Sequence, residues 1–327
     1  MMPVPDRRGT VGVSLESHKC LLYQVYGLTV LSEVVLPELT AVGNCQPDVE
    51  IRFGEVPQPP DSEELSNRRS WSMASSSEFI FSIKGVAKYH IANGRSITID
   101  RRLDLTKSVR SADLRLWLLG SAFGALLHQR GLLPLHVSAV KAPSGVWAFT
   151  GESGEGKSTL AGYLNRRFGW ELVSDDVSVI DPKSSEPVIY PGPRKLKLWA
   201  DALAHMKFTD GKILRDLSNT EKFQVYLSDE GFYEPESLRG LIVLKSVPEE
   251  VEPNIERLRG VEALRAFLDA VYRPRLQALF KAPEQRVSDI VPLCQSVSVY
   301  RFCRPRSLVG FESQLRPLLR LIAGAGA

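Results

Sequence analysis

The feature that most constrains this chain is a glycine-rich segment, residues 151–158, with the sequence GESGEGKS. It matches every fixed position of the pattern G-x-x-x-x-G-K-[ST], in which backbone N–H groups bind phosphate. Residues 146–150 (VWAFT) before it predict a buried strand, and residues 159–167 after it predict a helix. A strand, a glycine-rich turn and a helix are the context that this pattern requires. The sequence therefore predicts a phosphate-binding loop in an α/β domain.

Each residue type in this loop has a chemical reason to be there. Glycine permits positive φ angles and close approach, so successive N–H groups can converge on phosphate oxygens at the start of the helix. Lys157 would neutralise the terminal phosphates, and the Ser158 hydroxyl would occupy one position around Mg²⁺. We therefore predict that a nucleotide and Mg²⁺ bind here. The predicted binding residues are Gly151, Glu152, Ser153, Gly154, Glu155, Gly156, Lys157, Ser158 and Thr159.

Two acidic residues follow the next predicted strand, residues 170–174 (WELVS). Asp175 and Asp176 would then reach the same edge of the sheet as the loop, and either could supply the carboxylate that the metal still needs. His136 lies in a further predicted strand, residues 135–140. A hairpin at residues 142–145 would return the chain and place His136 beside the loop, although a lone strand histidine is more often structural.

Composition excludes several classes of protein. The 327 residues contain 41 Lys and Arg against 38 Asp and Glu, a balance that does not favour bulk nucleic-acid binding. The four cysteines have no spacing typical of zinc sites or disulfide frameworks, which favours a reducing compartment. The first residues lack the apolar stretch of a signal peptide, and the most apolar predicted helix, residues 117–127, is about half of the roughly 20 residues that a membrane span needs. We therefore expect a cytoplasmic protein without a membrane or nucleic-acid partner.

The sequence predicts two domains: a β-rich N-terminal domain, residues 1–110, and a catalytic domain, residues 111–327. Strand-like segments cover residues 21–32, 48–53, 78–84 and 86–99, the last with Asn93-Gly94 as a hairpin turn, and residues 57–69 predict a solvated loop. Residues 111–130 predict a helix that joins the two parts, with His128 at its surface or cap. Later strands are predicted at 222–227, 238–245 and 296–303, and helices at 261–275 and 308–322.

Basic residues in the second half are candidates for contacts with phosphate. Arg194, Lys195 and Lys197 on a Pro- and Gly-punctuated segment could face phosphate or an acidic substrate, or form a solvated strand. Candidates for nucleotide contacts, with exposure to solvent as the alternative, are Arg273, Arg275, Arg304 and Arg306.

The run from His136 through the loop to Ser174-Asp175-Asp176 resembles the catalytic domain of HPr serine kinase/phosphorylase, a family whose fold is similar to that of phosphoenolpyruvate carboxykinase. The resemblance implies an ATP-dependent protein serine kinase. It implies that His136 and Asp175 orient or deprotonate the acceptor hydroxyl. It also implies that Ser158 and Asp176 bind the metal, and that Lys157 binds the β and γ phosphates.

The chain also departs from that family. The family places a glutamate in E-x-R-G-x-G-I-I, whereas residues 236–244 read ESLRGLIVL, so Glu236 is not taken as the equivalent. The N-terminal half does not resemble the usual accessory domain. The layout resembles HPr-kinase-related proteins found beside ribosomal peptide modification systems, including kinases of lasso-peptide precursors.

We therefore predict a kinase of a serine in a peptide or small protein, with an acceptor groove near the β-rich unit. The alternatives are a nucleotide-binding regulator or ATPase without transfer, and a kinase of a small-molecule hydroxyl. Other donors, reverse phosphorolysis and assembly into a homo-oligomer are left open.

Overall fold

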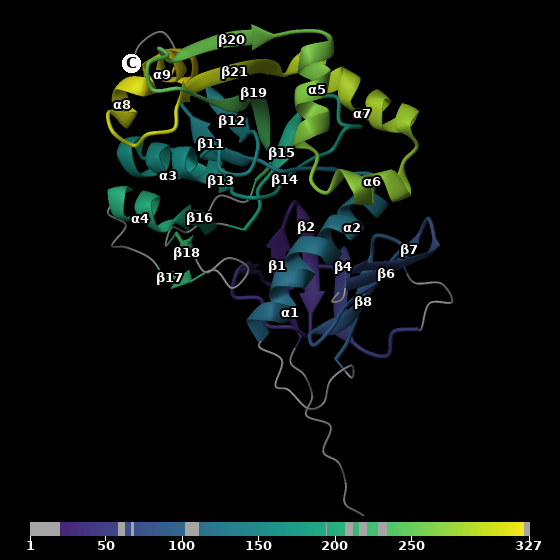
Figure 1. The fold of residues 1–327 in the computed structure, drawn as a ribbon. Coiled ribbons are helices and arrows are strands. Elements are labelled where there is room, and N and C mark those ends of the chain that lie inside the picture. Colours follow the sequence, from purple (N-terminus) through teal and green to yellow (C-terminus); the bar gives the residue numbers. More distant parts are fainter. Residues whose placement is uncertain are drawn as a thin grey trace, which may run out of the picture.

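The computed structural model describes residues 20–57, 63–66, 69–101, 111–193, 195–206, 212–215, 221–227 and 234–323. It is a mixed α/β structure in which a β-rich N-terminal part lies below a larger α/β part (Figure 1). Among the helices in these ranges, none is both long and apolar enough to cross a membrane. Arg194 of the predicted basic segment lies outside the described residues.

The N-terminal part is built on one sheet with the strand order β3-β1-β2-β4-β9-β8-β7-β6-β5. The predicted hairpin at Asn93-Gly94 is confirmed: it joins β8 to β9, and both turn residues have positive φ, at 56° and 61°. The strands of this sheet are β1 (Leu21–Val25), β2 (Leu28–Ser32), β3 (Thr40–Ala41), β4 (Val49–Phe53), β5 (Glu63–Ser66), β6 (Arg69–Ser75), β7 (Glu78–Ile83), β8 (Ala87–Ala92) and β9 (Ser96–Asp100).

Two predictions in this part were wrong in detail. Residues 21–32 form a hairpin, because the chain reverses at Tyr26 and Gly27, with φ of 56° and 72°. The predicted loop at residues 57–69 contains strand β5, which pairs with β6. Both differences come from strand pairing between neighbouring segments, which hydropathy alone does not reveal.

A helical segment crosses the N-terminal sheet and leads into the second part. It consists of α1 (Ser111–Trp117), a π-helical turn η1 (Leu118–Ala122) and α2 (Phe123–Gln129). The chain leaves the helix after Arg130, at Gly131, whose φ is 77°. Leu118 and Phe123 are fully buried in the same hydrophobic core as Tyr89 of β8. The domain boundary at residue 110 stays a prediction, and this helical segment shares its core with the N-terminal sheet.

The second part is built on a sheet with the order β10-β14-β15-β19-β12-β11-β13, in which β19 also pairs with β21, and β21 with β20. β12 runs parallel to β19, and β19 parallel to β21. A smaller sheet has the order β16-β18-β17. The strands are β10 (Leu133–Leu135), β11 (Ser138–Ala142), β12 (Gly145–Thr150), β13 (Glu171–Ser174), β14 (Ser178–Ile180), β15 (Val188–Tyr190), β16 (Lys195–Trp199), β17 (Lys212–Arg215), β18 (Lys222–Tyr226), β19 (Glu236–Val247), β20 (Asn254–Leu258) and β21 (Ser298–Pro305).

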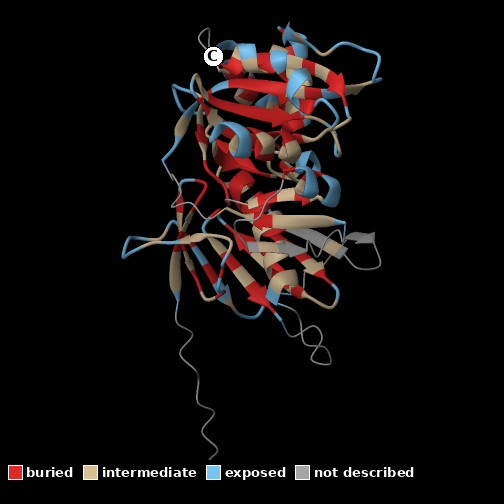
Figure 2. Ribbon diagram, turned by 90° about the vertical axis from the view of Figure 1, so that its left-hand side faces the viewer, coloured by how far each residue is buried: buried red, intermediate tan, exposed pale blue. Residues whose placement is uncertain are grey.

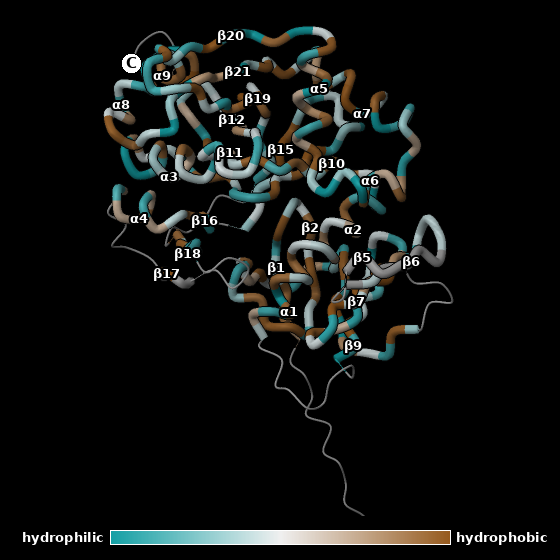
Figure 3. The backbone as a smooth tube through the Cα atoms, in the orientation of Figure 1, coloured by the Kyte–Doolittle hydropathy of each residue, from teal (hydrophilic) through white to brown (hydrophobic). Residues whose placement is uncertain are grey.

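Helices cover both faces of this second sheet. Alternation along β12 explains why: Trp147 and Phe149 belong to one hydrophobic core, and Val146 and Ala148 to the other. Figure 2 shows the buried strands in red between helices with exposed outer surfaces, and Figure 3 shows hydrophobic residues in brown along the strands. The core with Trp147 and Phe149 includes residues of α3 (Lys157–Phe168), α4 (Ala200–Met206), α8 (Phe311–Gln314) and α9 (Arg316–Ile322). The core with Val146 and Ala148 includes residues of α5 (Val261–Ala270) and α7 (Pro283–Ser296). Helix α6 (Pro274–Phe280) packs on the N-terminal core.

The remaining predicted elements are partly corrected. The helix predicted at 261–275 ends at Ala270, because Val271 leaves the helical conformation, with a ψ of 127°, and α6 begins only after Arg273. The C-terminal helix is divided into α8 and α9, and the strand at 222–227 belongs to the small sheet. The strand predicted at 135–140 is interrupted at His136, which lies between β10 and β11.

Candidate functional site

The glycine-rich loop, residues 151–156, connects β12 to α3 and contains three glycines, two at fixed positions of the pattern and Gly154 between them. Gly151, Gly154 and Gly156 have φ angles of 143°, 95° and 85°, which other residues rarely adopt. A Cβ atom on Gly151 would lie 2.8 Å from the Leu244 carbonyl oxygen, and one on Gly156 would lie 2.7 Å from Nη2 of Arg304. Both backbone shape and close packing therefore require glycine here.

Lys157 is turned into this loop. Its Nζ atom donates hydrogen bonds to the carbonyl oxygens of Gly151, at 2.8 Å, and Glu152, at 3.2 Å. The residue is only 8% exposed, and burial lowers the pKa of its amine, while the charges of Asp175 and Asp176 raise it. The loop therefore holds a largely buried cation close to two carboxylates.

Asp175 reaches the loop because of the order of the strands. β13 is antiparallel to β11, and β11 is antiparallel to β12, so the carboxyl ends of β12 and β13 lie at the same edge. Asp175 is 3% exposed and accepts hydrogen bonds from the Ser138 hydroxyl, at 2.5 Å, and the Lys197 backbone N–H, at 2.8 Å. Burial raises its pKa, and the hydrogen bonds from Ser138 and the Lys197 N–H, with a smaller contribution from the nearby Ser158 hydroxyl, act against that rise. The structure thus brings the loop serine and the first aspartate together.

Asp176 forms a cluster with His136 and Lys197. Its carboxylate lies 2.6 Å from Lys197 Nζ and 3.4 Å from His136 Nδ1, which is also 2.9 Å from the Asp176 carbonyl oxygen. Burial would raise the pKa of this carboxyl, but the hydrogen bond from His136 and the charge of Lys197 outweigh it and lower the pKa. Asp176 also has a φ of 82°, an unfavourable backbone angle of the kind that clusters at functional sites.

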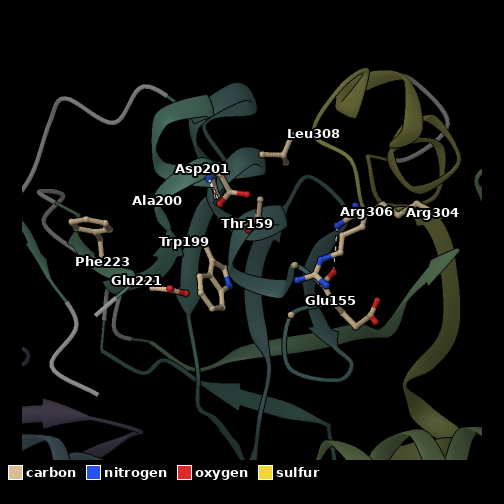
Figure 4. Close-up of a pocket in the computed structure, with 13 residues that line it drawn as sticks. Glu155, Thr159, Trp199, Ala200, Asp201, Glu221, Phe223, Arg304, Arg306 and Leu308 are labelled. Carbon is tan, nitrogen blue, oxygen red and sulfur yellow. Dashed lines mark hydrogen bonds between the residues drawn. The ribbon is translucent and has the colours of Figure 1, made fainter. Parts of the chain in front are cut away.

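A cavity of about 720 Å³ lies beside the loop (Figure 4). Trp199 and Phe223 from the small sheet contribute aromatic surface, and Arg304 and Arg306 lie next to the loop glycines. Arg304 is 4% exposed, it contacts the ring of Phe311, and burial lowers its pKa to about 10. Such a mixture of aromatic surface and guanidinium groups suits a ligand with a flat ring and a phosphate chain.

The four candidate arginines have different positions. Arg304 and Arg306 line the cavity beside the loop, whereas Arg273 lines another cavity beyond the aspartates. Arg275 is exposed on α6 and lines neither of these two cavities.

Sequence reasoning missed several residues of the site. Ser138, the hydrogen-bond donor to Asp175, follows His136 by two residues, a spacing that could have indicated a shared strand face. The ring of Tyr272 lies 6.3 Å from that of His136, but it comes from a distant part of the chain, and no local signal marks it.

Comparison with known proteins gave one weak structural match and no sequence match. No protein-family model and no curated protein sequence matches it. One solved structure that it resembles is described as the HPr(Ser) kinase/phosphatase from Coxiella burnetii. That match has 13% identity and a TM-score of 0.27, and it covers 58% of this chain and 99% of the other. A likeness this weak does not establish a shared function.

Proposed function

We propose that this protein is an ATP- and Mg²⁺-dependent kinase that transfers a phosphoryl group to a serine hydroxyl of a peptide or small protein. The observation that carries the proposal is the meeting of the Ser158 hydroxyl, the buried Lys157 amine and the carboxylate of Asp175 at one sheet edge. On the resemblance of residues 136–176, the catalytic part would be a phosphate-loop domain of the HPr-kinase type.

The donor side fits a nucleotide triphosphate. Gly151, Gly154 and Gly156 have positive φ angles, and their backbone leads into the amino end of α3, where the first N–H groups have no partner within the helix. Lys157 would exchange its bonds to loop carbonyls for bonds to phosphate oxygens. The aromatic side chains of Trp199 and Phe223 would receive the base in the adjoining cavity.

The residues present also fit Mg²⁺. In the described part of the chain, no three His, Cys, Asp or Glu side chains gather as a metal cluster. Mg²⁺ usually takes only one or two carboxylates and fills its other positions with water and substrate phosphate. Ser158 and Asp176 would hold it, because the hydrogen bond from His136 and the charge of Lys197 favour the ionised form of Asp176. When bound, the ion supplies charge neutralisation for the phosphates.

Asp175 is the proposed proton acceptor. It lies near the Ser158 hydroxyl and lines a second cavity, so it can receive the proton of the acceptor hydroxyl while the new oxygen–phosphorus bond forms and the bond to ADP breaks. Ser138 and the Lys197 N–H orient its carboxylate. His136 lies beside Asp176 and would orient the acceptor. Most of the rate would come from positioning and charge stabilisation.

The test uses ATP labelled in the γ-phosphate, the full-length protein and serine-containing peptides. Lys157→Ala should abolish transfer of label to peptide, because it removes the cation that contacts the terminal phosphates. The matched control is Lys141→Ala. Lys141 pairs with Glu236 and lies opposite Val146, near the start of β12 and so at the sheet edge away from the loop. This variant should keep full activity. Full peptide labelling by Lys157→Ala would show that the assignment is wrong.

The same labelling experiment separates the rival functions. A nucleotide-dependent regulator or ATPase would release the label only as free phosphate. A small-molecule kinase would place it on a metabolite, which mass spectrometry of a hydroxyl-compound panel would detect.

A further inference from the structure

The small sheet joins the two cavities of the site. Trp199, at the end of β16, lines the cavity beside the loop, which we call the loop cavity (Figure 4). The second cavity, of about 700 Å³, is lined by Asp175 and Asp176, and we call it the aspartate cavity. Lys197 lines the aspartate cavity and precedes Trp199 by two residues, so both side chains project from the same face of β16. This strand face therefore runs from one cavity to the other.

Strand β18 continues this face and carries Lys222 at the junction of the two cavities. β16 and β18 are antiparallel, and Lys222 lies opposite Trp199. Two residues further along β18, Gln224 lies opposite Lys197, and both of these residues line the aspartate cavity. Directly opposed residues project from the same face of a sheet. The register therefore places Lys222 where the shared face passes from the aspartate cavity to the loop cavity.

Two contacts show where the Lys222 ammonium lies. Its Nζ atom is 4.8 Å from the centre of the Trp199 ring. Its charge also acts on the loop lysine: burial lowers the pKa of the Lys157 amine most, and the charge of Lys222 lowers it as well. The charges of Asp175 and Asp176 act in the opposite direction and raise that pKa. Charges influence one another in this way when they are close, so Lys222 approaches both Lys157 and the aromatic surface.

Lys222 differs from its neighbour Lys197 in having no carboxylate partner. Lys197 forms an ion pair with Asp176 at 2.6 Å. Within the described part of the chain, no carboxylate lies within ion-pair distance of Lys222, which is half-buried against the Trp199 ring. Two ammonium groups that repel each other are both stabilised when an anion binds between them. The position of Lys222 and Lys157 therefore suits a phosphate group.

We propose that Lys222 is a further catalytic residue of this protein, and that its ammonium binds the γ-phosphoryl group of the nucleotide while that group is transferred. The inference rests on the proposed function, because it takes the loop as the site of the phosphates and Asp175 as the proton acceptor. It gives the small sheet a role in the reaction itself, in addition to the aromatic surface that it contributes to the loop cavity.

The role of Lys222 in the transfer is electrostatic. The acceptor oxygen forms a bond to the γ-phosphorus, the bond from that phosphorus to the bridging oxygen of ADP breaks, and ADP leaves with the electron pair. The proton of the acceptor hydroxyl passes to Asp175. Lys222 keeps its own proton and offsets the negative charge of the phosphoryl oxygens as the group moves from ADP to the acceptor.

The experiment compares the affinities of the full-length protein for ADP and for a non-hydrolysable ATP analogue, by calorimetry with Mg²⁺ present. Lys222→Met removes the ammonium and keeps an unbranched side chain against the Trp199 ring. We expect it to weaken binding of the ATP analogue about tenfold and to change ADP binding less than about twofold, because ADP lacks the group that Lys222 contacts. Single-turnover transfer of label from γ-labelled ATP to peptide should slow about 100-fold or more.

Other variants separate contact with phosphate from support of the aromatic surface. Lys222→Arg keeps a cation over the Trp199 ring and should retain most of the preference for the ATP analogue over ADP. Trp199→Leu removes the ring and should weaken binding of both nucleotides by similar factors, because both carry the base. The matched control is Lys183→Met, at an exposed lysine that lines neither cavity, and it should leave both affinities and the transfer rate unchanged.

The pattern of losses decides the inference. Equal weakening of ADP and ATP-analogue binding in Lys222→Met would show that this lysine merely supports the Trp199 ring, and the inference would be wrong. An unchanged transfer rate in Lys222→Met would overturn it as well, and retained ADP binding shows that the variant is folded. Failure of the proposed function would be seen in the unmodified protein, which would bind neither nucleotide or transfer no label, and the inference would fall with it.

Discussion

Protonation of a single buried histidine should make this protein less stable in mild acid. His128 lies in α2, is 2% exposed, and has its Nε2 atom 3.1 Å from the Tyr272 carbonyl oxygen. Its other ring nitrogen, Nδ1, has no hydrogen-bond partner among the described residues. It is therefore not the surface or capping residue that the sequence predicted. Its pKa is lowered from 6.5 to about 4, mainly by burial; the Tyr272 carbonyl acts against this shift and the charge of Lys281 adds to it.

The sign and size of the effect follow from this lowered pKa. Between pH 6.5 and 4 the unfolded chain binds a proton on His128 that the folded protein does not, so stability falls as the pH falls. Each pKa unit corresponds to about 1.4 kcal/mol, so the full difference is about 3 kcal/mol, of which about 1.4 kcal/mol is lost by pH 5.5. Above pH 7 the contribution is constant.

The assay compares His128→Gln with the unmodified protein in urea unfolding at pH 7.5, 5.5 and 4.5. Glutamine can still donate to the Tyr272 carbonyl but cannot be protonated, so the stability difference between the two proteins should shift by about 2.5 kcal/mol in favour of the variant between pH 7.5 and pH 4.5. His205→Gln, at an exposed histidine of α4, is the control. Parallel stability curves for His128→Gln and the unmodified protein would refute the reasoning, as would an NMR titration of His128 with a midpoint near 6.5.

Two further substitutions test the loop and its support. Gly156→Ala should weaken binding of a non-hydrolysable ATP analogue about tenfold, because it adds about 1–2 kcal/mol of backbone strain and places a Cβ atom 2.7 Å from Arg304. The control is Gly169→Ala, which has a similar φ and nothing within 4 Å of its Cβ, and it should leave this binding unchanged. Ser138→Ala removes a hydrogen bond to the buried Asp175 carboxylate and should lower the free energy of unfolding by about 1.5–3 kcal/mol, measured at neutral pH; an unchanged value would show that the bond contributes nothing.

Local chemistry made several parts of the structure predictable. The positive φ of Gly151, Gly154 and Gly156, and of the Asn93-Gly94 turn, follows from residues that tolerate this backbone. The end of α3 likewise falls at Gly169, which has a left-handed φ. These features depend on a few consecutive residues, so a sequence pattern could identify them.

Other features depended on contacts between distant segments. The burial of His128 depends on the chain near Tyr272, and the interruption of the predicted strand at His136 depends on that segment and on Asp176. Nothing in the residues around His128 marks it as buried, because a helix face becomes a core only when another element covers it.

The sequence alone determined the loop, its flanking strand and helix, and the presence of two aspartates after a second strand. Only the tertiary structure decided that β11 lies between these two strands, that Ser158 meets Asp175, and that the β1–β2 turn docks at Pro191 beside Asp176. The physical reason is that backbone propensity acts over a few residues, whereas strand order and docking are selected by the packing of the whole chain.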